Sequence, residues 1–155
     1  MDFFANHILS AVLFTPLVGA ILLLLIPRQM ALAHRIGGNI FGVLGFLVSL
    51  PLLFWWRPGV EAFSFQENLS WIPSIGARYH LGIDGISLLL VMLTTFLGMI
   101  AILSSWSAIH QRTKEYYILL LLLQTGMIGV FVALDFFLFY VFWEVMLVQI
   151  GRAHF

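Results

Sequence analysis

Four long, mostly apolar runs constrain the fold of this chain more than any other feature of its sequence. They cover residues 8–26, 37–56, 86–106 and 116–134, and a fifth run begins at Phe136. A helix needs about 20 apolar residues to cross the hydrocarbon core of a bilayer. Helices and closed barrels alone satisfy their backbone hydrogen bonds there. The runs therefore predict an all-α, polytopic bundle of about five transmembrane helices, the last one truncated.

The composition agrees with a membrane protein and excludes several other classes. The 155 residues are 62% hydrophobic and only 9% charged, whereas a soluble domain has about 25% charged residues. The net charge is zero, so nothing indicates a nucleic-acid partner. The chain has no cysteine for disulfides or thiolate metal sites, and its five histidines stand singly, so we expect no metal site and no cofactor-binding site.

The first apolar run is expected to remain as a helix and not to be removed as a signal peptide. Asp2 places an acid where a signal peptide has a basic region, and residues 8–26 are longer than the apolar part of such a peptide.

Two connecting segments are short and basic, and a third is long and of mixed charge. The short ones span residues 27–36 and 107–115 and carry Arg28, Arg35, Arg112 and Lys114. The long one, 57–85, alternates with them, so the two short loops are expected on the same side of the membrane. The positive-inside rule assigns that side to the cytoplasm or its equivalent.

The fifth run is too short for a full membrane crossing. Residues 136–150 give 15 residues, or roughly 22 Å of helix, against a hydrocarbon core of about 30 Å. Arg152 then stands where further apolar residues are needed. We therefore expect residues 1–148 to be the N-terminal part of a larger membrane subunit. Residues 149–155 are treated as a suspected non-native tail, with no function assigned.

Glu144 is an ionisable residue inside one of the most apolar stretches of the chain. A charge at membrane depth costs roughly 2.5–3.5 kcal/mol on insertion scales, and such residues are functional candidates by default. Glu144 follows Asp135 by nine residues, or about 13 Å of helix, which puts it near the middle of the bilayer. Proton transfer is the leading hypothesis. The alternative is a carboxyl group that only holds helices together.

The chain offers few neighbours for this carboxylate. Tyr140 is one helical turn earlier on the same face, so its hydroxyl is a possible second site residue. Gln124 and Thr125 are the remaining interior polar candidates. The only lysine, Lys114, is expected in a loop. We therefore predict that a cationic partner comes from sequence after residue 155 or from a neighbouring subunit.

Two aspartates stand immediately before predicted helices. Asp135 precedes the fifth helix, and Asp84 precedes the third. Aspartate is a favoured N-cap because its carboxylate accepts free backbone N–H groups. Capping is the leading interpretation of both, and a direct place in a proton path stays open for Asp135. Gly126 and Gly129 on the fourth helix predict close helix packing.

Four stretches together carry a family resemblance. They are Trp71-Ile72-Pro73, then His80-Leu81-Gly82-Ile83-Asp84-Gly85-Ile86-Ser87-Leu88, then Leu93-Thr94 running to Ser105-Trp106, and finally Ala133-Leu134-Asp135-Phe136-Phe137-Leu138-Phe139-Tyr140-Val141-Phe142-Trp143-Glu144-Val145-Met146-Leu147-Val148. The chain resembles the antiporter-like subunit M (chain 4) family of respiratory NADH:quinone oxidoreductase, or complex I, almost throughout. It departs from the family pattern at Gln149, where proline is usual.

The resemblance implies a membrane-arm subunit of the enzyme complex that takes part in proton translocation coupled to electron transfer from NADH to quinone. It implies that Glu144 matches the family's essential glutamate, which pairs with a lysine on a later helix. It also implies that NADH, flavin, iron–sulfur clusters and quinone bind to other subunits. The expected partners are other membrane-arm subunits and the lipid bilayer. The expected location is a bacterial plasma membrane, with the mitochondrial inner membrane as the alternative.

Two rival functions remain open at this point. A subunit of a multisubunit cation/proton antiporter, or of a membrane-bound hydrogenase complex, would share the fold and the glutamate. A non-catalytic membrane scaffold would use Glu144 only to fix helix packing.

Overall fold

The structure is a computed structural model that describes residues 2–152. In chain order, the elements are α1 (Asp2–Asn6), α2 (Ile8–Leu25), α3 (Ala31–Trp55), β1 (Ser64–Ile72), the 3-10 turn η1 (Pro73–Ile75), β2 (Ala77–Ile83), α4 (Gly85–Ser104), α5 (Thr113–Val132) and α6 (Phe136–Arg152).

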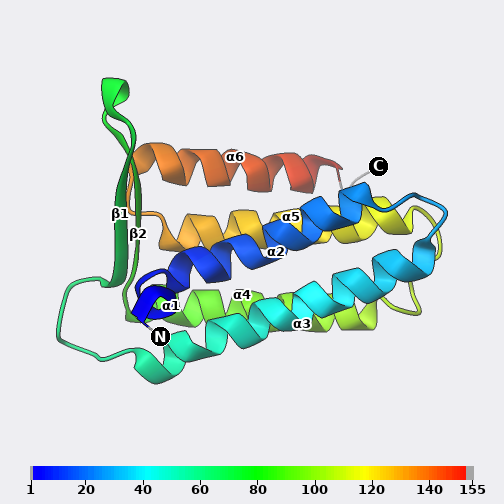
Figure 1. The fold of residues 1–155 in the computed structure, drawn as a ribbon, viewed down its shortest axis with the longest axis horizontal. Helices are drawn as coiled ribbons and strands as arrows, with labels where there is room; N and C mark the ends of the chain where they lie inside the picture. The colour runs from blue at the N-terminus through cyan, green and yellow to red at the C-terminus, as the bar shows by residue number, and fades with distance from the viewer. Residues whose placement is uncertain (1, 153–155) are drawn as a thin grey trace.

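The five long helices lie side by side in one bundle (Figure 1). Helix α5 contacts α2, α3, α4 and α6, so it is the centre of the bundle, whereas α6 packs chiefly on α5. Helices α2 to α5 are long and apolar enough to cross a membrane, and α6 is shorter. The predicted polytopic helical bundle is confirmed, and the chain is an integral, multi-pass membrane protein.

Two helices begin earlier than the apolar runs predict. Helix α3 starts at Ala31 and α5 at Thr113, so Arg35 and Lys114 belong to helices and not to loops. The polar first turn of α3 contacts the loop before α5, and the polar first turn of α5 contacts the loop before α3. Arg35 Nη2 donates to the Ile109 carbonyl at 2.7 Å, and Lys114 Nζ donates to the Ile26 carbonyl at 2.7 Å. These contacts confirm that the two short basic loops lie at the same end.

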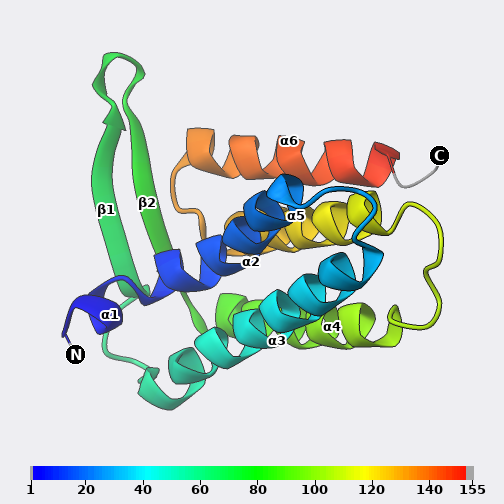
Figure 2. The ribbon, with the colours of Figure 1, turned by 45° about the vertical axis from the view of Figure 1, so that its right-hand side comes forward.

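The long segment 57–85 contains a β-hairpin, which the sequence reasoning missed. Strands β1 and β2 pair antiparallel, with Asn68 opposite His80. Gly76 closes the turn in the left-handed conformation, at φ 72°. The hairpin lies across the end of the bundle and extends past α6 (Figure 2). The backbone N–H of Leu134 donates to the His80 carbonyl at 2.8 Å, so β2 also holds the junction between α5 and α6.

Glu67 joins this hairpin to the bundle. Its carboxylate is only 6% exposed and accepts both the backbone N–H of Ser10, at 3.0 Å, and the Ser10 hydroxyl. Helix α2 has no side-chain cap from His7, so Glu67 supplies an acceptor at this helix N-terminus from a distant strand. Ser10 also contacts the Tyr79 hydroxyl at 2.6 Å. Burial, with a smaller contribution from the Glu67 charge, raises the pKa of Tyr79.

We expect Glu67→Ala to destabilise the chain by about 1.5–3 kcal/mol, because hydrogen bonds to a charged group contribute roughly that much. Thermal unfolding in detergent would measure the loss. Glu61→Ala removes an exposed carboxylate from the same segment and serves as the matched control. Equal stability of the two variants would show that the Ser10 contacts add nothing.

Candidate functional site

Asp135 lies at the start of α6 and caps it. Its Oδ2 accepts the backbone N–H of Leu138 at 3.2 Å, and its backbone carbonyl accepts the N–H of Phe139 at 2.9 Å. The predicted capping role is therefore confirmed. The side chain is half-buried at the end of the bundle that carries the hairpin. Asp135 thus fixes where α6 begins and, through the helical rise, the depth at which Glu144 lies.

Two substitutions at Asp135 separate capping from proton transfer. Asparagine also caps helices but does not titrate, whereas alanine does neither. If capping is the whole role, Asp135→Asn keeps both stability and proton translocation, and Asp135→Ala lowers the unfolding free energy by about 1 kcal/mol. Unfolding in detergent and proton flux in vesicles would measure the two effects. Loss of proton flux in stable Asp135→Asn would assign the residue to the proton path.

Helix α6 approaches α5 closely at two glycines, as the sequence predicts. A Cβ atom at Gly126 would lie 3.3 Å from the Met146 backbone nitrogen, and one at Gly129 would clash with the Phe142 ring. Leu138, on the same face of α6, is 4% exposed. The side of α6 that carries Leu138, Phe142 and Met146 is therefore fixed against α5.

Glu144 lies on the other side of α6. It is exposed, and so is Tyr140, at 53%, one turn earlier. Tyr140 and Glu144 are four residues apart in α6 and therefore share one face of the helix. Among the side chains of residues 3–151, no salt bridge involves Glu144. The structure therefore brings the two predicted site residues together on one exposed face of α6.

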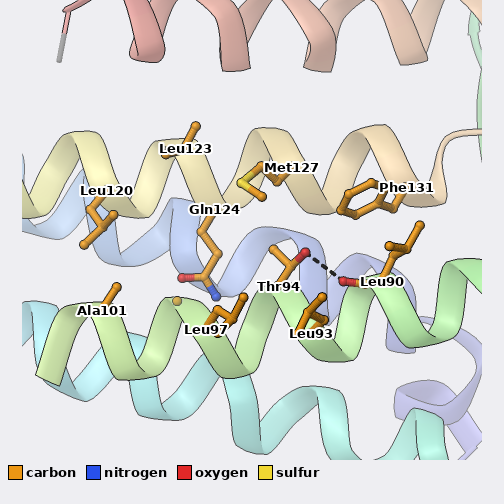
Figure 3. A pocket seen from close by; sticks show the side chains of 11 residues that line it. Leu90, Leu93, Thr94, Leu97, Ala101, Leu120, Leu123, Gln124, Met127 and Phe131 are labelled. Carbon is orange, nitrogen blue, oxygen red and sulfur yellow. Dashed lines mark hydrogen bonds between the residues drawn. The ribbon is translucent and has the colours of Figure 1, made fainter. Parts of the chain in front are cut away.

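The remaining interior polar candidates are far from this face. Gln124 on α5 is 4% exposed and points toward α4, into an apolar cavity of about 280 Å³ (Figure 3). Both of its carboxamide atoms have no hydrogen-bond partner among residues 2–152. The Thr125 hydroxyl donates to the Leu121 carbonyl at 3.0 Å. The structure thus places neither side chain beside Glu144.

Asp84 is the second predicted cap, and it is confirmed at the start of α4. Its Oδ1 accepts the backbone N–H of Ser87 at 2.8 Å, and this bond lowers the pKa of the Asp84 carboxyl. Among residues 2–152, no group of three or more His, Asp or Glu side chains could hold a metal ion.

Curated proteins similar to this chain include one from a plant and one from a bacterium. NADH-ubiquinone oxidoreductase chain 4 of Arabidopsis thaliana is 42% identical over 140 residues, which is 90% of this chain and 28% of that protein. NADH-quinone oxidoreductase subunit M of Rhodobacter capsulatus is 43% identical over 143 residues, which is 90% of this chain and 27% of that protein. The chain thus spans little more than a quarter of the length of these relatives. No family model matches the sequence.

Two solved structures share the arrangement of the helices. A chain of the membrane-bound sulfane sulfur reductase, an archaeal respiratory membrane complex, superposes with a TM-score of 0.66 at 26% identity, over 89% of this chain and 21% of that one. A chain of the Mrp complex from Dietzia superposes with a TM-score of 0.74 at 20% identity, over 91% of this chain and 15% of that one. The second likeness concerns the fold alone.

Proposed function

We infer the function from the family of this chain, which belongs with subunit M and chain 4 of NADH-quinone oxidoreductases. In this proposal it is a membrane-arm subunit that moves protons across the membrane. Its relatives are named as subunits of an enzyme complex that transfers electrons from NADH to quinone. In this proposal the chain carries no redox centre. It contributes a titratable carboxyl group, Glu144, to a proton path coupled to electron transfer elsewhere in the complex.

The orientation of Glu144 carries the proposal. The side chain lies among exposed apolar residues of α6, including Trp143, Leu147 and Val148. In membrane proteins, ionisable side chains within helices face the protein interior or a water-filled cavity and almost never face lipid. We therefore propose that further polypeptide covers this face of α6 and that Glu144 is interior in the assembled protein.

The polypeptide that covers this face must also compensate the charge of the Glu144 carboxylate. Desolvation disfavours the ionised form of a carboxyl group, and a nearby cation favours it. We propose that a cationic side chain from sequence after residue 155, or from a neighbouring subunit, lies against Glu144. We further propose that the Tyr140 hydroxyl, one helical turn earlier, donates a hydrogen bond to the same carboxylate.

The proposed assembly follows from the names of the relatives. Other membrane-arm subunits would be the partners, and NADH, flavin, iron–sulfur clusters and quinone would bind to other chains. The solved structures favour one second candidate. Because the fold also matches the Mrp and sulfane sulfur reductase complexes, a subunit of a related ion-translocating complex is the alternative.

Purification of the native assembly through an affinity tag on this subunit would separate the two. We expect the purified complex to oxidise NADH with reduction of a quinone analogue and to acidify one side of a vesicle membrane. A complex that exchanges Na⁺ for protons without NADH oxidation would support the alternative and exclude the proposed function.

A further inference from the structure

A large cavity opens at the end of the bundle where the two short basic loops meet, far from the hairpin and Asp135. Its volume is about 730 Å³, and it lies between the last turn of α2, the segment before α5, the first turns of α5 and Gln149 near the end of α6. One part of its wall is apolar, with Leu24, Ile118 and Leu122. The other part is basic, with Arg28, Arg112 and Lys114. The sequence reasoning used these charges only to orient the chain in the membrane.

The positive charge of this group is only partly neutralised. Lys114 Nζ donates to the carbonyls of Leu24, at 2.8 Å, and Ile26, at 2.7 Å, which are dipoles without net charge. Arg28 pairs with Glu115 at 3.1 Å, the one salt bridge among the side chains of residues 3–151. Three cations thus line the cavity with a single carboxylate.

A second, smaller cavity of about 360 Å³ adjoins the same group on its polar side, and it shares Arg28, Arg112, Lys114 and Glu115 with the larger one. Arg112 itself stands in the left-handed conformation at the N-terminus of α5 and gives that helix no side-chain cap. The free backbone N–H groups of this first turn add a positive potential at the same place.

We propose that this cavity binds an anionic phospholipid, with the phosphate between Arg112 and Lys114 and an acyl chain along Leu24, Ile118 and Leu122. The cavity joins a basic region at the helix ends to an apolar wall that continues down the membrane-spanning helices. Basic pockets between helices at the cytoplasmic surface are suited to anionic lipid headgroups. The inference requires that the bundle spans a membrane with this end at the cytoplasmic side, and it does not depend on proton transfer at Glu144.

Lipid retention in the intact assembly tests the proposal. The complex is purified from membranes, exchanged into nanodiscs of phosphatidylcholine and phosphatidylglycerol in equal parts, and released into a mass spectrometer to count retained phosphatidylglycerol. Arg112→Gln and Lys114→Gln should each weaken retention about fivefold, which corresponds to one basic group near the membrane surface. Arg78→Gln removes an exposed cation from the hairpin and should change nothing.

A substitution that should increase lipid retention controls for variants that lose lipid only because they fold poorly. Glu115→Gln removes the only carboxylate in the group and frees Arg28, so it should increase phosphatidylglycerol retention. Inorganic phosphate added in excess should not displace the lipid, because phosphate cannot occupy the apolar wall. Displacement by phosphate, unchanged retention in Arg112→Gln and Lys114→Gln, or reduced retention in Glu115→Gln would each overturn the proposal.

Discussion

Glu144→Gln is expected to reduce proton translocation by on the order of a hundredfold, to the background leak of the membrane, while the complex still assembles. Glutamine keeps the size and hydrogen-bonding capacity of the side chain but cannot exchange a proton, and proton transfer by a positioned group contributes about 10²- to 10⁴-fold. The assembly should survive because the fixed face of α6 is the other one, where Leu138 and Phe142 pack. Proton flux in vesicles, measured with a pH-sensitive dye and normalised to complex content, gives the result.

Glu61→Gln is the matched control. Glu61 is an exposed acid in the segment before β1 and lies outside every helix, so its neutralisation should leave proton flux unchanged. Tyr140→Phe should give a smaller loss than Glu144→Gln, because the hydroxyl assists the carboxylate and does not replace it. Full proton flux in Glu144→Gln would favour the scaffold alternative, in which the carboxylate only fixes helix packing.

The sequence predicted the helices because their signal is a single physical requirement. A bilayer needs about 20 apolar residues for each crossing, and α2 to α5 satisfy it with some additional polar residues at the ends. The two caps were predictable for a similar reason, since Asp84 and Asp135 each stand directly before an apolar run. A helix that is apolar around its whole circumference does not show from its sequence which face packs against the bundle. The exposed position of Glu144 therefore emerged only from the packing of α6.

The hairpin was missed because its strands lack the usual alternation of apolar and polar residues. Most of β1 is exposed, and its one buried side chain is the charged Glu67. A turn signal was present, since Pro73 and Gly76 stand three residues apart between the two strands. The Glu67–Ser10 contact joins residues 57 positions apart in the sequence. No local sequence pattern predicts such a contact, so only the three-dimensional structure could reveal it.

Substitution of Gly129 is expected to have the second large effect on stability and proton translocation. The reason is that the position of Glu144 depends on how closely α6 packs against α5. The Phe142 ring occupies the space that a side chain on Gly129 would need. We expect Gly129→Leu to destabilise the subunit by about 1–3 kcal/mol, the usual cost of overpacking, and to lower proton translocation by displacing α6. Unfolding in detergent and proton flux in vesicles would measure both.

A second substitution tests whether the clash with Phe142 is the cause. Phe142→Ala, combined with Gly129→Leu, removes the ring and leaves space for the new side chain, so the double variant should be more stable than the sum of the single effects predicts. If the site depends on where α6 lies, the recovered packing of the double variant should also restore proton flux. Strictly additive single effects would show that Gly129 acts through something other than its contact with Phe142.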